Sequence, residues 1–173
     1  MRLLRKVLLV LLLCGLATAW TLTDIRGETR SAHGDTIAVR DGDTLTIAGV
    51  DHRLHGIDAP EYQQICRDVR GKDWPCGLAA RAALVALIKG KTLTCEERAR
   101  DKYTRVVATC LDSAGRDIAR ALAEQGMAIS MDGFSEGPYA TEVEMARAKK
   151  LGIWQGIFDP PSTWREQHVR APL

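Results

Sequence analysis

Three short segments of the chain gather acidic and basic side chains that together could cleave a phosphodiester bond. They are Asp41-Gly42-Asp43-Thr44, residues 53–61 with the sequence RLHGIDAPE, and Asp101-Lys102-Tyr103-Thr104-Arg105. Carboxylates are ligands that a hard divalent cation prefers, and the planar fork of an arginine binds two phosphate oxygens at once. A glutamate fixed behind a proline could accept a proton from water. The segments therefore hold the residue types for metal-assisted phosphate ester hydrolysis.

Taken singly, these residues have plainer explanations. Asp41-Gly42-Asp43 is a common turn sequence, and Glu61 alone is an ordinary surface residue. Arg53 and Asp58 are five residues apart, and an odd separation places two side chains on opposite faces of a strand. They can meet only if the strand twists or the chain bends at Gly56. The prediction depends on the whole set and its order along the chain.

The first 19 residues have the pattern of a secretory signal peptide. Three basic residues, Arg2, Arg5 and Lys6, precede an apolar run at 7–13 and the small-residue cleavage pattern at 17–19. The apolar run is short for a membrane span, which needs about 20 residues, and an uncleaved membrane anchor is the alternative. We therefore expect a periplasmic or secreted protein with no stable membrane association after cleavage.

The charge balance changes when this leader is set aside. The whole chain has 24 Lys+Arg against 22 Asp+Glu, a net charge of +2. The leader holds three basic and no acidic residues, so 21 basic and 22 acidic residues remain, a net charge of −1. Strong nonspecific nucleic-acid binders carry a basic excess. Binding to DNA or RNA must therefore come from a local site.

Four of the five cysteines lie outside the leader. An even number in an exported domain indicates disulfides. Cys66 and Cys76 enclose a short loop, whereas Cys95 and Cys110 lie in strand-like runs on either side of a polar turn. We expect the pairs Cys66–Cys76 and Cys95–Cys110. A zinc site is the alternative, and the absence of a CxxC pair disfavours it.

The apolar patterning predicts a mixed α+β domain. Five runs rich in Ile, Val and Thr read as strands at residues 36–40, 44–48, 52–57, 91–97 and 105–111. Three stretches with apolar residues at helical spacing cover residues 77–89, 117–125 and 140–151. A helix between the third and fourth strands, with two helices after the fifth, is the element order of a five-stranded OB-fold β-barrel with three helices.

We place this domain at residues 35–156, between a polar arm at 20–34 and a C-terminal tail at 157–173. The remaining large side chains are assigned to packing, namely Trp74, Trp154, Trp164, Met127 and Met131. His52 and His55 are expected on the surface or on an edge strand.

In order and spacing the three charged segments resemble the staphylococcal-nuclease-like (thermonuclease) family, in an exported bacterial branch. The resemblance runs from about Thr36 to Trp154 and includes the stretches LAEQG at 122–126 and ARAKKLGIW at 146–154. It implies the OB barrel with three helices, in agreement with the element order.

The resemblance also implies roles for individual residues. Asp43 and Asp58 match the carboxylates that bind Ca²⁺ in the family, and Ala59 matches the position that lends its backbone carbonyl to the ion. Glu61 matches the general base that activates water. The metal and the base would therefore lie side by side.

The substrate side is implied in the same way. Arg53 and Arg105 match the two arginines on the scissile phosphate, and Asp101, Lys102 and Tyr103 match a turn that faces the substrate. Two guanidinium groups and a cation would stabilise the charge of the transition state.

Two positions depart from the family pattern. Thr104 stands where the family usually has glycine, which is costly if the backbone there is left-handed. Counted without gaps, Asp132 and Phe134 stand where tyrosines stack on the base. Phe134 can stack, whereas Asp132 cannot. These departures concern substrate binding more than the reaction.

The sequence thus predicts a monomeric, exported, Ca²⁺-dependent nuclease that hydrolyses DNA or RNA by water attack. Two alternatives remain, since a fold does not determine function. One is a non-catalytic binding module on the same fold. The other is an envelope accessory factor in exopolysaccharide (succinoglycan) production, because some exported relatives of this branch are described that way. The complete set of acidic and basic residues favours the nuclease.

Overall fold

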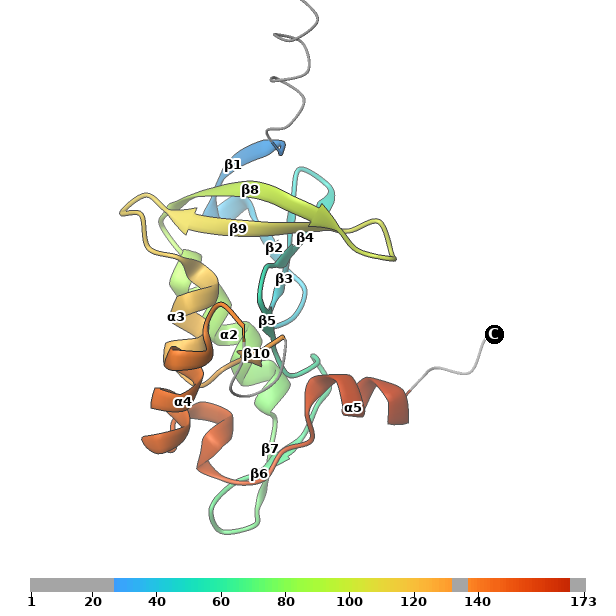
Figure 1. Cartoon of the computed structure of the whole chain (residues 1–173), viewed down its shortest axis with the longest axis vertical. Helices are drawn as coiled ribbons and strands as arrows, with labels where there is room; N and C mark the ends of the chain where they lie inside the picture. Colours follow the sequence, from blue (N-terminus) through green and yellow to red (C-terminus); the bar gives the residue numbers. More distant parts are fainter. Residues whose placement is uncertain (1–26, 132–136, 169–173) are drawn as a thin grey trace, which may run out of the picture.

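The computed structural model describes residues 27–131 and 137–168 of the 173-residue chain. Its main layer is a curled six-stranded sheet with the order β1-β8-β9-β4-β3-β2 (Figure 1). These strands are β1 (Thr29–His33), β2 (Ala38–Val39), β3 (Thr44–Ile47), β4 (Val50–Leu54), β8 (Thr92–Arg100) and β9 (Val106–Asp112). The parallel pairing of β4 with β9 joins the β2–β4 meander to the long β8–β9 hairpin.

Two short strand pairs and four described α-helices complete the domain. The pairs are β5 (Ile57–Asp58) with β10 (Ile129–Ser130), and β6 (Cys66–Arg67) with β7 (Asp73–Trp74). The α-helices are α2 (Cys76–Ile88), α3 (Ile118–Glu124), α4 (Ala140–Ala148) and α5 (Pro161–Gln167), and the 3-10 turns are η1 (Gly34–Thr36) and η2 (Gly152–Gln155). The predicted α+β, OB-like class is confirmed.

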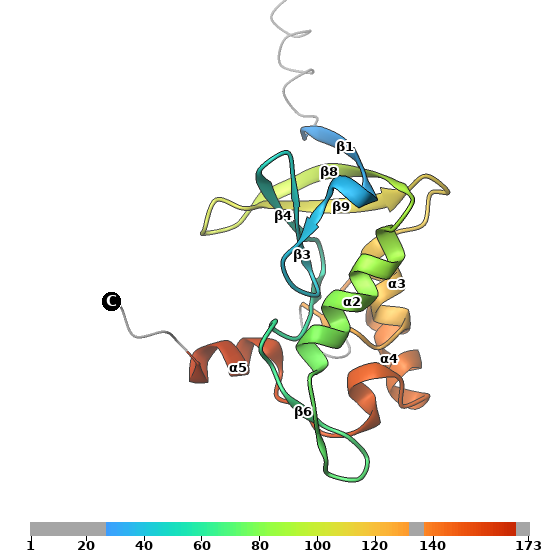
Figure 2. The ribbon, with the colours of Figure 1, turned by 180° about the vertical axis from the view of Figure 1, so that it is seen from behind.

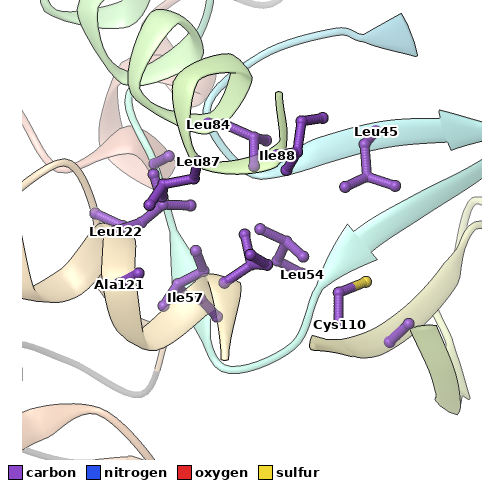
Figure 3. Close-up of a cluster of buried hydrophobic side chains, with 14 of the residues drawn as sticks. Leu45, Leu54, Ile57, Leu84, Leu87, Ile88, Cys110, Ala121 and Leu122 are labelled. Atoms are coloured by element: carbon purple, nitrogen blue, oxygen red, sulfur yellow. The ribbon is translucent and has the colours of Figure 1, made fainter. Parts of the chain in front are cut away.

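The core lies between the sheet and the helices α2 and α3. Leu45 and Leu54 come from the sheet, Leu84 and Ile88 from α2, and Leu122 from α3, and their side chains point toward one another (Figure 3). All five are at most 2% exposed. Burying such side chains contributes about 1.5–3 kcal/mol each, so this packing holds the sheet at a fixed angle to α2.

A second apolar cluster ties the loop at 62–76 to the C-terminal part of the chain. Its buried members are Cys66, Cys76, Ile129 and Ile153, and the partly buried Trp74, Trp154 and Phe158 pack against them. The disulfide Cys66–Cys76 lies in this cluster. The other predicted disulfide, Cys95–Cys110, joins directly paired positions of β8 and β9.

The structure differs from the sequence prediction in two elements. β1 falls inside the expected arm at 20–34, where it pairs antiparallel with β8. Its residues are exposed or only half-buried, so no apolar alternation marked it. α5 falls inside the expected tail, where Pro161 at the first helical position starts it. In both views α5 lies on the side of the molecule away from α3 and α4 (Figures 1 and 2).

Three smaller expectations also changed. The single strand predicted at 52–57 is divided by a turn at Gly56 into β4 and β5. His52 is 2% exposed instead of on the surface, and its Nδ1 is bonded to the carbonyl of Val50 at 2.8 Å. Met131, expected in the core, is 48% exposed. The predicted signal peptide at 1–19 and Phe134 lie outside the described residues. Among those described, no helix has the length and apolar character needed to cross a membrane.

Candidate active site

The turn between β2 and β3 fixes the position of Asp43. The carboxylate of Asp41 accepts hydrogen bonds from the backbone N–H groups of Asp43 and Thr44, at 3.0 and 2.7 Å. Gly42 packs so tightly that an added Cβ would lie 2.7 Å from the Cβ atoms of both Ala59 and Ala80. The glycine therefore lets the turn rest directly on α2, and the Asp-Gly-Asp sequence has a positional role here beyond making a turn.

A bend at Gly56 brings Arg53 and Asp58 together. Gly56 has φ of +80°, and an added Cβ would lie 2.9 Å from Pro138. The Nη2 atom of Arg53 donates to Oδ1 of Asp58 at 2.5 Å, and its Nη1 donates to Oδ1 of Asp43 at 2.9 Å. One guanidinium thus spans both carboxylates. The bend resolves the odd sequence separation that would keep Arg53 and Asp58 on opposite faces of a straight strand.

Asp43 and Arg53 are almost completely buried, at 2% and 6% exposure. Burial raises the pKa of Asp43 to about 7 despite the opposing charge of Arg53. Burial alone would lower the pKa of Arg53, but Asp43 and Asp58 together raise it. The second oxygen of Asp43 accepts the backbone N–H of Ala59 at 3.1 Å. The ionised form of Asp43 therefore needs nearby positive charge.

This donor set fits a hard divalent cation that takes only part of its ligands from the protein. Two buried carboxylates, Asp43 and Asp58, lie within the span of one guanidinium. Within residues 27–131 and 137–168, no three His, Cys, Asp or Glu side chains form a ready-made cage. Cations bound by one or two carboxylates complete their shell with water or substrate phosphate oxygens. The expected contribution of the Ala59 carbonyl stays a prediction.

Glu61 is held at the edge of these carboxylates by the fully buried Gln64. The backbone N–H of Glu61 donates to the side-chain oxygen of Gln64 at 3.1 Å, and the N–H of Gln64 donates to the Glu61 carbonyl at 2.7 Å. The amide nitrogen of Gln64 donates to the carbonyl of Asp159 at 2.8 Å. The loop that carries Glu61 is therefore bonded directly to the segment before α5.

Arg165 of α5 is a site residue that the sequence reasoning missed. Its Nη1 and Nη2 donate to the two oxygens of Asp58 at 2.9 and 3.0 Å, and its Nη1 also donates to Oε1 of Glu61 at 2.7 Å. Partial burial opposes protonation, but the bonds to Asp58 and Glu61 raise the pKa of Arg165. More than a hundred residues separate Arg165 from Asp58 and Glu61 in the sequence. No motif around Arg165 indicated that it belongs to the site.

The turn between β8 and β9 orients Arg105. Asp101 accepts the backbone N–H of Arg105 at 3.0 Å and its Nε at 2.7 Å. Thr104 has φ of +65°, so the backbone is left-handed at the position where the family usually has glycine. Arg105 is not displaced by this residue, because Asp101 holds both its backbone and its side chain. Tyr103 is 65% exposed, and its ring centre lies 5.1 Å from Nζ of Lys102.

These parts border one cavity of about 530 Å³. The residues that line it are Asp41, Arg53, Glu61, Lys102, Tyr103, Arg105, Met131 and Arg165. The β8–β9 turn and α5 extend to the same side of the molecule in both views (Figures 1 and 2). The structure thus brings most of the predicted residues to one place, with Asp43 and Asp58 behind Arg53 and with Asp101 behind Arg105. Asp41, Met131 and Arg165 are additions.

Comparison with known proteins agrees with this geometry. The family model described as staphylococcal nuclease homologue matches residues 51–156. The chain is 41% identical over 119 residues to the succinoglycan biosynthesis protein ExoI of Rhizobium meliloti (strain 1021), covering 68% of this chain and 62% of ExoI. It is 28% identical over 141 residues to an uncharacterized endonuclease of Escherichia coli, covering 78% and 86% of the two chains. A probable endonuclease, LCL3 of Verticillium alfalfae, is 31% identical over 139 residues, covering 73% and 45%.

Proposed function

Since the chain belongs to the staphylococcal nuclease homologue family, we propose that it is an exported, Ca²⁺-dependent nuclease that hydrolyses phosphodiester bonds of DNA or RNA. The observation that carries this proposal is a cavity lined by Glu61, Arg53 and Arg105, with Asp43 and Asp58 bonded to Arg53 behind its wall. The endonuclease names of the Escherichia coli and Verticillium relatives support the same reaction class.

In the proposed reaction, Glu61 accepts a proton from the water that attacks phosphorus, and the phosphorus–oxygen bond to the leaving group breaks. Arg53 and Arg105 neutralise charge that develops on the phosphate oxygens, in a site where both are oriented by carboxylates before substrate binds. Asp43 and Asp58 would hold the cation. When bound, a divalent cation polarises a phosphate oxygen as a Lewis acid.

The substrate is held by local rather than overall charge. Lys102, Arg53 and Arg105 line the cavity, although the chain without its leader carries a net charge of −1. Neutralised phosphates account for the salt dependence of nucleic-acid binding. Because few basic residues contact phosphates, the affinity should depend only weakly on salt. We expect the substrate to be single-stranded, since a single strand can bend into the cavity.

A nuclease assay on the oxidised protein tests the proposal. Wild type should cleave single-stranded DNA or RNA with millimolar Ca²⁺, and EDTA should abolish the cleavage. Glu61→Gln should lower the rate about 10²–10⁴-fold, the usual contribution of a general base. Glu166→Gln, at an exposed position of α5 that borders no described cavity, serves as the matched control. Absence of turnover on both nucleic acids by the folded wild type would refute the proposal.

Export is supported by the two disulfides, which persist in oxidising compartments. A periplasmic or secreted location predicts a shorter mature chain in the culture or periplasm than in the total translation product. Mass spectrometry of the recovered protein measures that difference.

A second candidate function is an accessory role in exopolysaccharide production, favoured by the 41% identity to ExoI. The chain spans 62% of the length of ExoI. Complementing a deletion strain with wild type or Glu61→Gln separates the alternatives. Polysaccharide yield restored by both proteins would indicate a binding module, whereas yield restored by wild type alone would indicate that hydrolysis is needed.

A further inference from the structure

A second cavity lies next to the first and shares two of its walls. It has a volume of about 850 Å³. The residues that line it are Glu61, Tyr62, Gln63, Ile65, Asp159, Trp164, Arg165 and His168. Glu61 and Arg165 border both cavities. The second cavity is therefore built from the loop after Glu61 and from α5, which follows the segment matched by the family model.

Its walls present aromatic and apolar surface. The Trp164 ring stacks on the His168 ring with 4.1 Å between centroids and 10° between planes. Tyr62 and Ile65 are 48% and 52% exposed. His168 directly follows α5, and its Nδ1 is bonded to the Trp164 carbonyl at 2.9 Å, so the stacked pair is ordered before any ligand arrives. Rigid aromatic faces of this kind stack on nucleic-acid bases of any sequence.

Three contacts of the segment just before α5 fix the position of this helix next to the first cavity. Gln64 bonds the Asp159 carbonyl, Arg67 forms a strand-like bridge with Ile157, and the Phe158 ring meets Trp154 edge-on at 5.1 Å. The Cys66–Cys76 disulfide fixes the loop at the other end of these contacts. The aromatic surface is thus anchored at a defined position relative to Glu61.

A polynucleotide with its scissile phosphate between Arg53 and Arg105 must continue in both directions. One side faces the turn with Lys102 and Tyr103, and the other side passes Glu61. We propose that the second cavity is a nucleotide subsite for the strand on the far side of the scissile phosphate, with Trp164 stacking on its base. This inference rests on the proposed function and extends it to substrates longer than two nucleotides.

Arg165 borders both cavities, so it can contact the strand where the strand passes from one cavity to the other. Its guanidinium is bound to Asp58 and Glu61, and a phosphate offers the same planar pair of anionic oxygens. When the strand enters, Arg165 exchanges its bonds to Asp58 and Glu61 for bonds to the first phosphate beyond the scissile one, which joins the nucleotide in the second cavity to the rest of the strand. This exchange releases Oε1 of Glu61 and Oδ2 of Asp58, while Oδ1 of Asp58 still accepts from Arg53.

Steady-state kinetics on two substrates tests the subsite. The substrates are a dinucleotide and a single-stranded oligonucleotide of about ten nucleotides, a length within the usual range of single-strand sites. In wild type, kcat/KM should favour the longer substrate. Trp164→Ala should lower the ratio of the two kcat/KM values about tenfold, as expected for one lost base stack. Trp164→Phe should keep most of the ratio, and Glu166→Ala should match wild type.

Binding gives a readout that does not need turnover. In the Glu61→Gln background, the longer oligonucleotide should quench tryptophan fluorescence, and Trp164→Ala should abolish most of the quenching. Tyr62→Ala, which removes a second ring from the same cavity, should weaken binding if Trp164→Ala fails to fold.

Several results would overturn the subsite. An unchanged ratio in a folded Trp164→Ala protein, or an equal loss on both substrates, would mean that Trp164 only supports the fold. The subsite would also be refuted if the Tyr62→Ala and Trp164→Ala variants bound the oligonucleotide as tightly as their Glu61→Gln parent. A wild type that hydrolyses neither substrate yet shows Trp164-dependent quenching would refute the proposed hydrolysis and leave the subsite standing.

Discussion

At the scale of single residues, the site is organised by two arginines that bind carboxylates. Arg53 joins Asp43 to Asp58 from within the sheet, and Arg165 joins Asp58 to Glu61 from the C-terminal helix. Asp58 therefore accepts from both guanidinium groups. A cation at Asp58 would meet the positive charge of Arg165, whose fork already occupies both oxygens of that carboxylate.

Arg165→Ala should consequently bind Ca²⁺ more tightly. Removing one positive charge at a partly exposed position should strengthen cation binding about 5- to 10-fold, after allowance for solvent screening. The apo protein should melt at a lower temperature, because Asp58 and Glu61 lose their partner. Added Ca²⁺ should raise the melting temperature more than it does in wild type, since at a given concentration a ligand stabilises the folded state more when it binds more tightly. Differential scanning calorimetry with and without Ca²⁺ measures both.

Two variants check the interpretation of that result. Arg165→Lys keeps the charge and loses the two-pronged fork, so its Ca²⁺-dependent shift should lie between those of wild type and Arg165→Ala. Arg147→Ala removes an exposed arginine of α4 paired with Glu144 and should shift as wild type does. An Arg165→Ala protein with the wild-type response would show that the ion pairs do not compete with the metal.

At the scale of elements, the turn between β8 and β9 stores strain where it presents Arg105. Thr104 adopts φ of +65°, which costs a non-glycine residue about 1–2 kcal/mol. Its hydroxyl donates to the Tyr103 carbonyl at 2.6 Å, a local bond that offsets part of the cost. The turn keeps its shape because Asp101 accepts from the backbone of both Tyr103 and Arg105.

Thr104→Gly should therefore stabilise the protein. Relief of the left-handed strain exceeds the extra chain entropy of glycine, about 0.5–1 kcal/mol, so the net gain should be about 0.5–1 kcal/mol, or about 1–4 °C in melting temperature. Thr92→Gly, an exposed position of β8 without positive φ, should instead destabilise. Chemical denaturation of the three proteins compares them. Equal losses in both variants would mean that Thr104 is not strained.

At the scale of the whole molecule, the sequence predicts features that depend on neighbouring residues better than features that depend on contacts between distant segments. Alternating Ile, Val and Thr marked the strands that bury one face. Helical spacing marked the helix at 77–89, although Leu78 and Val85, two of the apolar residues with that spacing, are 43% and 38% exposed. The order of the charged segments along the chain led to the prediction of one site, and the structure places Arg53, Glu61, Lys102, Tyr103 and Arg105 around one cavity, while their roles in the reaction stay predictions. β1 was missed because its sequence, TRSAH, has no apolar alternation and none of its residues is buried. Contacts such as Arg165 with Asp58 depend on packing between distant segments, and no local pattern records them.

The fold also predicts that α5 can be removed without loss of the main core. Every member of the large buried cluster precedes residue 157, and the smaller cluster receives only Phe158 from beyond it. Truncation after Pro160 keeps Phe158 and the Asp159 carbonyl that Gln64 bonds. We expect cooperative unfolding, with a melting temperature lower by about 2–8 °C for a loss of about 1–2 kcal/mol.

The same truncation removes Arg165 and Trp164 together, so two consequences should appear at once. Ca²⁺ should stabilise the truncated protein more than the full chain, as for Arg165→Ala, because Asp58 and Glu61 are no longer paired with Arg165. The preference for the longer oligonucleotide should disappear, as for Trp164→Ala. Circular dichroism establishes folding before either comparison. A truncated protein that unfolds without cooperativity would place α5 within the folding core, whereas a folded one with unchanged Ca²⁺ response and unchanged length preference would separate α5 from the active site.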